Sequence, residues 1–120
     1  VLADRDETTL ALAMAEFASA EAQVLARPLD VADRAALETL RDEVMGRFGA
    51  VHLLMNNAGI QPGSALFSPV EDWERILAVN LWGIIHGTQV FVPAMLESGQ
   101  PGIVVNTGSK QGITTPPGDP

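Results

Sequence analysis

The chain has 120 residues, a formal net charge of −8 and no cysteine. Fifteen acidic against seven basic side chains argue against a nucleic-acid partner, since a phosphate backbone attracts basic surfaces. The absence of cysteine excludes disulfides, thiolate nucleophiles and cysteine-ligated metals, while a hydrophobic content of 47% and this length suit one folded domain.

The first half of the chain predicts two short strands, each followed by a helix. Residues 1–3 have the composition of the end of a buried strand, and Asp6 favours a helix start through the helix dipole. A second apolar run covers 24–26. Apolar residues then recur at helical spacing over 33–48, and Gly49 follows as a helix stop.

The second half predicts two more strands around one long helix. The nearly all-apolar segment 51–55 is typical of a strand buried on both faces. Ser68 as the N-cap, with a proline and a glutamate behind it, predicts a helix over 69–97. A kink is expected near Pro93. A fourth strand covers 103–105.

Strands that alternate with helices predict an α/β fold, a doubly wound parallel sheet covered on both faces. In such sheets, ligands bind outside the carboxyl ends of the strands. The residues at these ends are therefore the candidates for function: Asp4, Asp30, Asn56–Gly59 and Asn106–Ser109.

Asp4 and Asp30 are candidate contacts to a dinucleotide. An acid in the position of Asp4 accepts hydrogen bonds from ribose hydroxyls and repels a 2′-phosphate, which favours NAD over NADP. Arg5 weakens that preference, because a guanidinium can receive a phosphate. Asp30 is a possible partner for the adenine amino group. Each acid has a simpler reading as a helix cap, and for Asp30 taken alone the cap is favoured.

The segment Asn56–Gly59 carries the most specific signal. Alanine and glycine allow a ligand to approach the backbone closely, and amide side chains can tie neighbouring strand ends together. The alternative is a plain turn, which has no need of two asparagines, an alanine and a glycine after a buried strand.

Asn80 and Ser109 are the candidate catalytic residues. Asn80 lies in the middle of the long helix and shares a face with Gly83 and Gly87, a pattern that favours close packing on a sheet. Its alternative role is that of a hydrogen-bonded core asparagine. Ser109 follows the last strand in a glycine-containing loop, where its hydroxyl can reach a substrate oxygen. The sequence around it is not the nucleophile elbow of a hydrolase.

Other features predict absences. His52 and His86 have no partners at metal-ligand spacing, so we read both as structural and expect no metal site. No uninterrupted apolar run reaches the roughly 18 residues of a membrane span, and no signal peptide is visible. We therefore expect a cytoplasmic protein without a membrane partner. The first residue, Val1, and the proline-rich end at 116–120 predict a piece of a longer chain.

Taken together, these motifs resemble the classical short-chain dehydrogenase/reductase family over essentially all 120 residues. Asn56–Gly59 is similar to that family's motif after its fourth strand, with Asn57, Ala58 and Gly59 at the cofactor. Asp30 and Val31 are similar to its adenine-contacting pair. Asn80 and Ser109 stand at its catalytic asparagine and serine.

The resemblance implies a Rossmann-like domain over 1–120, from the second strand to the loop after the fifth. It implies hydride transfer between NAD, with NADP less favoured, and a small alcohol or carbonyl substrate. Ser109 would hold the substrate oxygen, and Asn80 would shape the helix and support a proton relay. Homo-oligomers would form through the long helix 69–97, with Trp73, Trp82 and Phe91 as interface or core residues.

Two departures from the family pattern limit the resemblance. The chain contains neither the family's glycine-rich loop nor its Tyr-x-x-x-Lys pair, and it has no tyrosine. In the family's strand order, 3-2-1-4-5, the first strand separates the second from the fourth, so its absence predicts a sheet split in the middle. The open alternatives are a non-catalytic dinucleotide-binding or structural module of the same fold and, more weakly, a receiver or flavodoxin-like domain.

Overall fold

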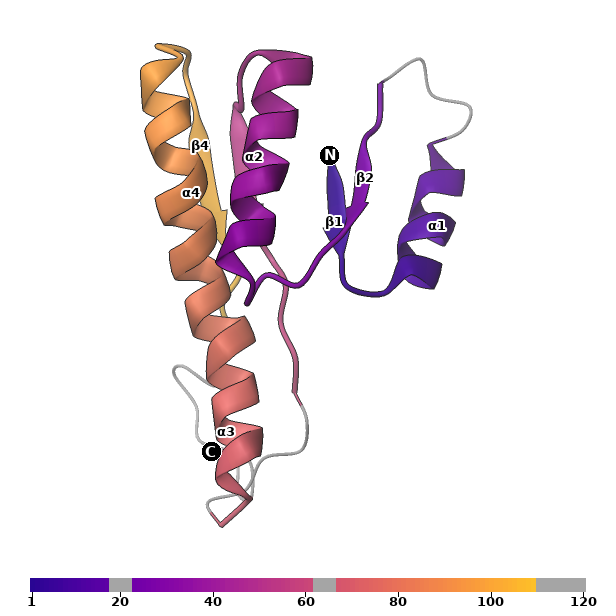
Figure 1. Cartoon of the computed structure of the whole chain (residues 1–120), viewed down its shortest axis with the longest axis vertical. Coiled ribbons are helices and arrows are strands. Elements are labelled where there is room, and N and C mark those ends of the chain that lie inside the picture. Colours follow the sequence, from indigo (N-terminus) through magenta and orange to yellow (C-terminus); the bar gives the residue numbers. More distant parts are fainter. Residues whose placement is uncertain (18–22, 62–66, 110–120) are drawn as a thin grey trace.

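The computed structural model describes residues 1–17, 23–61 and 67–109 (Figure 1). Strands and helices alternate along these segments as the sequence predicts. The first half holds β1 (Leu2–Asp4), α1 (Glu7–Glu16), β2 (Ala26–Pro28) and α2 (Arg34–Phe48). The second half holds β3 (Leu53–Asn56), α3 (Val70–Leu77), the π-helical turn η1 (Ala78–Trp82), α4 (Gly83–Glu97) and β4 (Ile103–Asn106).

Strand β2 lies two residues later than predicted, because it includes Arg27 and Pro28. Its partner β1 bonds to alternate residues of this segment: Leu25 accepts from the Leu2 N–H, and the Leu29 N–H donates to Asp4. The nitrogen of Pro28 therefore faces away from β1, where a missing N–H costs no ladder bond. Proline is tolerated inside this strand for that reason.

Helix α2 has the caps that the sequence predicts. The Asp33 carboxylate accepts from the backbone N–H groups of Ala35 and Ala36, at 2.9 and 3.2 Å. At the other end Gly49 adopts a left-handed conformation with φ of 78°, which glycine reaches without steric cost. The apolar stripe of α2 is buried, including Leu37 and Val44.

The long helix differs from the prediction in two details. Its N-cap is Pro69 and not Ser68, because Pro69 has an extended ψ of 144° and the first helical residue is Val70. Pro93 lies inside regular α4, whereas the change in helical geometry occurs at η1, where the backbone widens into a π turn. Helices α3, η1 and α4 form one continuous rod in Figure 1.

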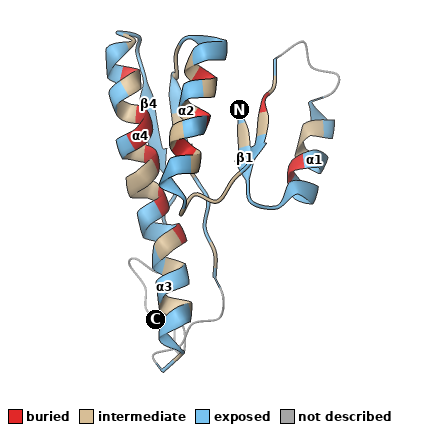
Figure 2. Ribbon diagram, viewed as in Figure 1, coloured by how far each residue is buried: buried red, intermediate tan, exposed pale blue. Residues whose placement is uncertain are grey.

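The hydrophobic core lies where α2 and α4 meet over β3, and it coincides with most of the buried positions in Figure 2. Its buried members are Leu25, Leu37, Leu40, Val44, Val90 and Phe91. Glycines allow α4 to approach its neighbours closely. A Cβ on Gly87 would stand 2.2 Å from Asn56 Oδ1, and one on Gly83 would stand 2.7 Å from Val31 Cγ2. The close packing predicted for these glycines is confirmed.

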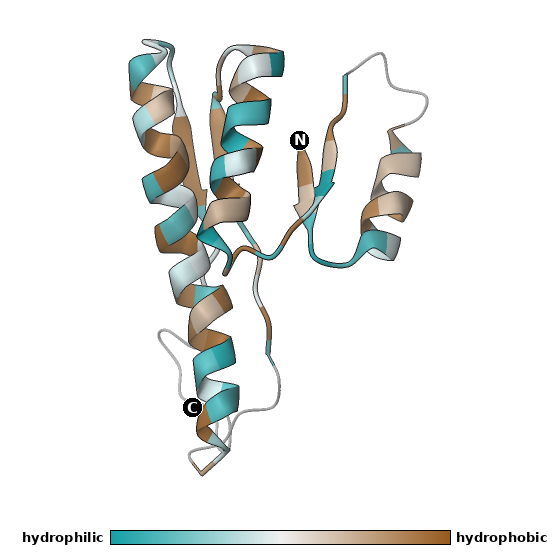
Figure 3. Cartoon of the chain, in the orientation of Figure 1, coloured by the Kyte–Doolittle hydropathy of each residue, from teal (hydrophilic) through white to brown (hydrophobic). Residues whose placement is uncertain are grey.

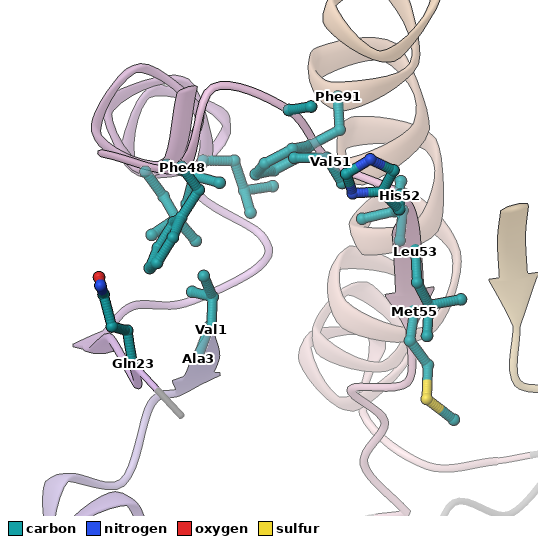
Figure 4. A pocket seen from close by; sticks show the side chains of 14 residues that line it. Val1, Ala3, Gln23, Phe48, Val51, His52, Leu53, Met55 and Phe91 are labelled. Atoms are coloured by element: carbon teal, nitrogen blue, oxygen red, sulfur yellow. The ribbon is translucent and has the colours of Figure 1, made fainter. Parts of the chain in front are cut away.

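Among the residues described, the strands form two separate parallel pairs, β1 with β2 and β3 with β4. A hollow of about 450 Å³ lies between β1 and β3, with Val1 and Ala3 on one side and Leu53 and Met55 on the other (Figure 4). The sheet is split between these two strands, as the family's strand order predicts.

The prediction that the strand over 51–55 is buried on both faces is wrong for this structure. Leu53 and Met55 are 59% and 58% exposed, while Leu54, on the opposite face, packs against the core. All four residues of β4 are exposed as well. Figure 3 shows brown, hydrophobic strands at these exposed positions. The strand composition fits two covered faces, but α2 and α4 cover only one of them.

Within the described part of the chain, one helix is long and apolar enough to cross a membrane. It covers Val70–Glu97, with a mean hydropathy of 1.3 over its most apolar 18 residues. The sequence prediction considered only uninterrupted apolar runs and therefore missed it. Length and composition alone make weak evidence for a span, because a core helix passes the same test. Here α4 packs against α2 and β3, and 28% of the apolar window is buried.

Candidate functional site

The loops that carry the candidate residues lie together at one end of the strands. The parallel register pairs Asn56 with Asn106, so the loops that follow β3 and β4 leave the sheet side by side. The register of the other pair ends at Asp4 and Pro28.

A second hollow, of about 260 Å³, opens where the ends of β1, β2 and β3 approach one another. All six residues predicted to contact the cofactor line it: Asp4, Asp30, Val31, Asn57, Ala58 and Gly59. Arg5, Leu29 and Val79 complete much of the wall. The sequence prediction thus selected residues from three separate loops that share one cavity.

The two candidate carboxylates are each fixed by one backbone hydrogen bond. Asp4 Oδ1 accepts from the Asp6 N–H at 2.8 Å, and Asp30 Oδ1 accepts from the Ala32 N–H at 2.9 Å. The favoured reading of Asp30 as the cap of the following helix is wrong, because Asp33 occupies the N-cap of α2. Asp30 instead stabilises the turn that leads into that cap.

Asp6 begins α1 beside the cavity and has a lowered pKa. The main cause is the hydrogen bond that its carboxylate accepts from the Thr9 backbone N–H, at 2.9 Å; the nearby Arg5 guanidinium acts in the same direction. Asp6 therefore stays ionised as the N-cap of α1, where negative charge suits the helix dipole. Together with Asp4 and Asp30, it makes this end of the cavity acidic.

Side-chain hydrogen bonds tie the ends of β3 and β4 together. Asn56 Nδ2 donates to Asn106 Oδ1 at 2.8 Å, and the Thr107 hydroxyl donates to Asn57 Oδ1 at 2.9 Å. The predicted role of the amides as ties between neighbouring strands is confirmed. The partnership of Thr107 with Asn57 was missed by the sequence analysis, since 50 residues separate the two.

Asn80 uses its whole amide group on the loop after Gly59. Its Oδ1 accepts from the Ile60 N–H at 2.8 Å, and its Nδ2 donates to the Ile60 carbonyl at 2.9 Å. The alternative of a core asparagine is wrong as to location, because Asn80 is exposed. It lies within the π turn η1, so the widened helix presents it to the loop that borders the cavity. No local signal in the sequence pairs residues 60 and 80.

Ser109 lies on the exposed loop that continues from Thr107, at the same end of the sheet as Ala58 and Gly59. The serine loop and the small-residue turn are therefore neighbours and do not lie at opposite ends of the sheet. This arrangement is the one that the predicted catalytic role requires. Lys110 and 111–120, the run towards the chain end, lie outside the described residues.

Neither His52 nor His86 belongs to a cluster of metal-ligating side chains among the described residues. His86 Nδ1 lies 3.4 Å from the Val31 carbonyl, and its ring packs near Trp82. His52 faces the other hollow, between β1 and β3. In the ranges that the structure covers, no three histidine, aspartate or glutamate side chains gather as a metal site would need.

Comparison with known proteins decides the family. The sequence profile of the short chain dehydrogenase family matches residues 1–119. The chain belongs to the short-chain dehydrogenase family. The fold agrees, because a short-chain dehydrogenase/reductase from Burkholderia phymatum, solved in complex with NAD, superposes with a TM-score of 0.91 at 40% identity. That match covers 97% of this chain and 42% of the solved one.

Named relatives in this family act on different substrates. The chain is 37% identical over 112 residues to 1-deoxy-11-beta-hydroxypentalenate dehydrogenase of Streptomyces avermitilis, which covers 91% of this chain and 42% of the relative. It is 32% identical over 113 residues to 3beta-hydroxysteroid dehydrogenase 2 of Eggerthella lenta, covering 92% and 44%. The chain thus spans less than half the length of these short-chain dehydrogenases. Its fold is α/β and Rossmann-like, as predicted.

The described cavity fits the nucleoside end of a nicotinamide cofactor. Carboxylates at Asp4 and Asp30 can accept hydrogen bonds from hydroxyl and amino groups. Leu29 and Val31 offer apolar contact to a base. A Cβ added to Gly59 would lie 3.6 Å from Asn80 Oδ1, in ordinary van der Waals contact, so crowding by the described residues does not itself require glycine there.

Proposed function

We propose that the whole protein is an NAD(H)-dependent oxidoreductase that moves a hydride between the nicotinamide and a small alcohol or carbonyl substrate. The supporting observation is that six residues, chosen from three strand ends, line one cavity in a short-chain dehydrogenase framework. The loop of Ser109 leaves the sheet at the same end. Bound NAD(H) would supply or accept the hydride, and the protein would position it.

The residues of this chain would divide the work of binding. Asp4 would accept from the ribose hydroxyls, and its charge would oppose a 2′-phosphate, which favours NAD over NADP. Asp30 and Val31 would hold the adenine. Ala58 and Gly59 would let the cofactor lie against the backbone after β3. Each of these residues lines the cavity.

Ser109 and Asn80 would serve the reacting end. A hydroxyl at Ser109 would donate to the substrate oxygen and stabilise the negative charge that develops on it. Asn80 would act through the loop that it holds, because its amide is already committed to Ile60. It would thereby keep the turn at Gly59 in the place that the cofactor needs.

We also propose that copies of the chain associate through the long helix and that the protein is cytoplasmic. Leu77, Leu81 and Trp82 are 46%, 48% and 51% exposed along this helix and would be buried by a second copy. Phe91, considered at the sequence level for the same role, is 6% exposed and belongs to the core.

The proposal is tested by Ser109→Ala in the whole protein. We expect turnover to fall by about two orders of magnitude, the size of one lost oxyanion donor, while the dissociation constant for NADH stays near that of the wild type. Steady-state rates and NADH fluorescence titration measure the two quantities.

Two results would contradict the assignment. Unchanged turnover would remove Ser109 from the catalytic machinery. A wild-type protein that binds NADH but reduces or oxidises nothing in a panel of alcohols, ketones, sugars and acyl substrates would favour the alternative of a non-catalytic dinucleotide-binding module. Ser98→Ala is a suitable control, since Ser98 is the C-cap of α4, donates to the Met95 carbonyl and precedes β4, whereas Ser109 follows it.

A further inference from the structure

Arg5 is the one cation among the residues that line the acidic cavity, where it stands among three carboxylates. Arginine is the side chain best suited to grip a phosphate, because its planar guanidinium offers paired donors. Its neighbour Asp4 marks the place where a ribose would lie. Arg5 is therefore close in sequence to the position at which a 2′-phosphate would be accepted or refused.

The structure pairs this guanidinium with Asp30 and not with Asp4. Arg5 Nη1 lies 3.8 Å from Asp30 Oδ2, and it is the only ion pair that Arg5 forms with the residues described. Asp30 can hold two partners at once, because its other oxygen, Oδ1, accepts from the Ala32 N–H. Asp30 is thus fixed by the turn before α2, while its other carboxylate oxygen pairs with Arg5.

We propose that Asp30 is a positioning residue that sets cofactor choice by holding Arg5 away from the ribose. While the guanidinium is paired with Asp30, the Asp4 carboxylate faces the 2′ position without a compensating charge, and NADP is refused. When the hold is removed, Arg5 is free to pair with a 2′-phosphate. This inference rests on the proposed function, since it supposes that a nicotinamide dinucleotide binds here.

The Arg5 and Asp30 side chains differ in how firmly they are held, and this difference decides which of them moves when the ion pair breaks. The Arg5 side chain is 68% exposed, while that of Asp30 is 39% exposed and has its second anchor at Ala32. Arg5 is therefore the member that moves when the pair breaks. An exposed ion pair is weak, so the expected change in preference is moderate, about fivefold.

The test is the ratio of dissociation constants for NADPH and NADH, measured by fluorescence titration of the whole protein. Asp30→Asn keeps the shape and an oxygen for the Ala32 N–H but removes the charge. We expect it to improve NADPH binding relative to NADH by about fivefold, the upper range for an exposed ion pair. Glu7→Gln is the matched control: it removes one negative charge two residues along the chain from Arg5, and Glu7 is not among the residues that line this cavity.

The double variant R5Q/D30N separates positioning from simple repulsion. If Asp30 acts through Arg5, then D30N changes the ratio by less than about twofold in the R5Q background. If D30N has its full effect there, Asp30 repels the phosphate directly and the inference is wrong. An equal effect from E7Q, or none from D30N, also overturns it. Circular dichroism shows whether D30N is folded, and loss of an adenine contact by Asp30 would weaken both dinucleotides alike and leave their ratio unchanged. A wild type that binds neither dinucleotide would instead refute the proposed function.

Discussion

Asn80 is the residue whose contacts say most about the site. It replaces two missing backbone partners of Ile60 with one amide group, donating to the carbonyl and accepting from the N–H. Side chains can satisfy backbone N–H and carbonyl groups that have no partner in a helix or sheet. Ile60, next to Gly59, is therefore anchored to η1.

Asn80→Ala should loosen this loop without unfolding the protein. Each exposed hydrogen bond contributes about 1 kcal/mol, so the Ile60 N–H should exchange with solvent about fivefold faster, and NADH should bind more weakly. Amide hydrogen exchange of the whole protein measures the first effect. Gln89→Ala on the same helix is the control, because its partner is Arg34 on α2. Unaltered exchange at Ile60 would show that the loop is held by other contacts.

At this scale, the sequence predicted which residues line the cofactor cavity but not what holds them in place. The carboxyl ends of parallel strands lie at one edge of a sheet, so the sequence alone predicts that Asp4, Asp30 and Asn57 belong to one site. The contact between Asn80 and Ile60 spans 20 residues and involves a backbone group in a loop. Nothing in local composition marks such a partner, which is why it was missed.

Among the secondary-structure elements, α4 and β3 approach each other through a glycine. A Cβ at Gly87 would stand 2.2 Å from Asn56 Oδ1, so the Asn56 side chain or the helix would have to shift to admit it. Asn56 is also the residue that ties β3 to β4 by donating to Asn106. A change at Gly87 therefore acts on the helix contact and on the tie between two strands.

Gly87→Ala should lower the free energy of unfolding of the whole protein by about 1–3 kcal/mol, the usual cost of overpacking. Gly46→Ala is the matched control on α2, since a Cβ there would meet nothing within 4 Å. In a helix interior this second change should raise stability by about 0.5–1 kcal/mol. Denaturant unfolding of both variants gives the two values. A stable G87A variant would mean that Asn56 can move aside at no cost.

Element types were predicted correctly from the sequence, while their ends were fixed by tertiary contacts. The caps of α2 could be recognised because Asp33 and Gly49 act on their own helix. The end of β2 depends on its ladder with β1, and proline at position 28 suggested a break where the structure continues. The residues of the π turn η1 do not differ in type from those of an ordinary helix, so the turn could not be predicted. Its asparagine, Asn80, accepts a hydrogen bond from Ile60 in a loop 20 residues earlier.

In the molecule as a whole, the strands are more apolar than their degree of burial requires. Parallel strands are stable when helices cover both faces and when each edge finds a partner. In the part of the chain that the structure describes, β1 and β3 each have one paired edge, and the hollow of about 450 Å³ lies between them. The sequence predicted the fold class and the split, yet it predicted burial of 51–55 on both faces, since apolar composition reports what a strand needs and not what is present.

The 120 residues on their own should therefore not form a cooperatively folded monomer. Each unpaired buried backbone group costs about 1–3 kcal/mol, whereas a domain has a net stability of only about 5–15 kcal/mol. Exposed strand residues such as Leu53 and Met55 add a drive towards association. Circular dichroism during heating should show a broad transition, and size-exclusion chromatography should show oligomers or aggregates. The whole protein, under the same conditions, should melt sharply; a reversible two-state transition of the isolated 120 residues as a monomer would show that the split sheet is stable as it stands.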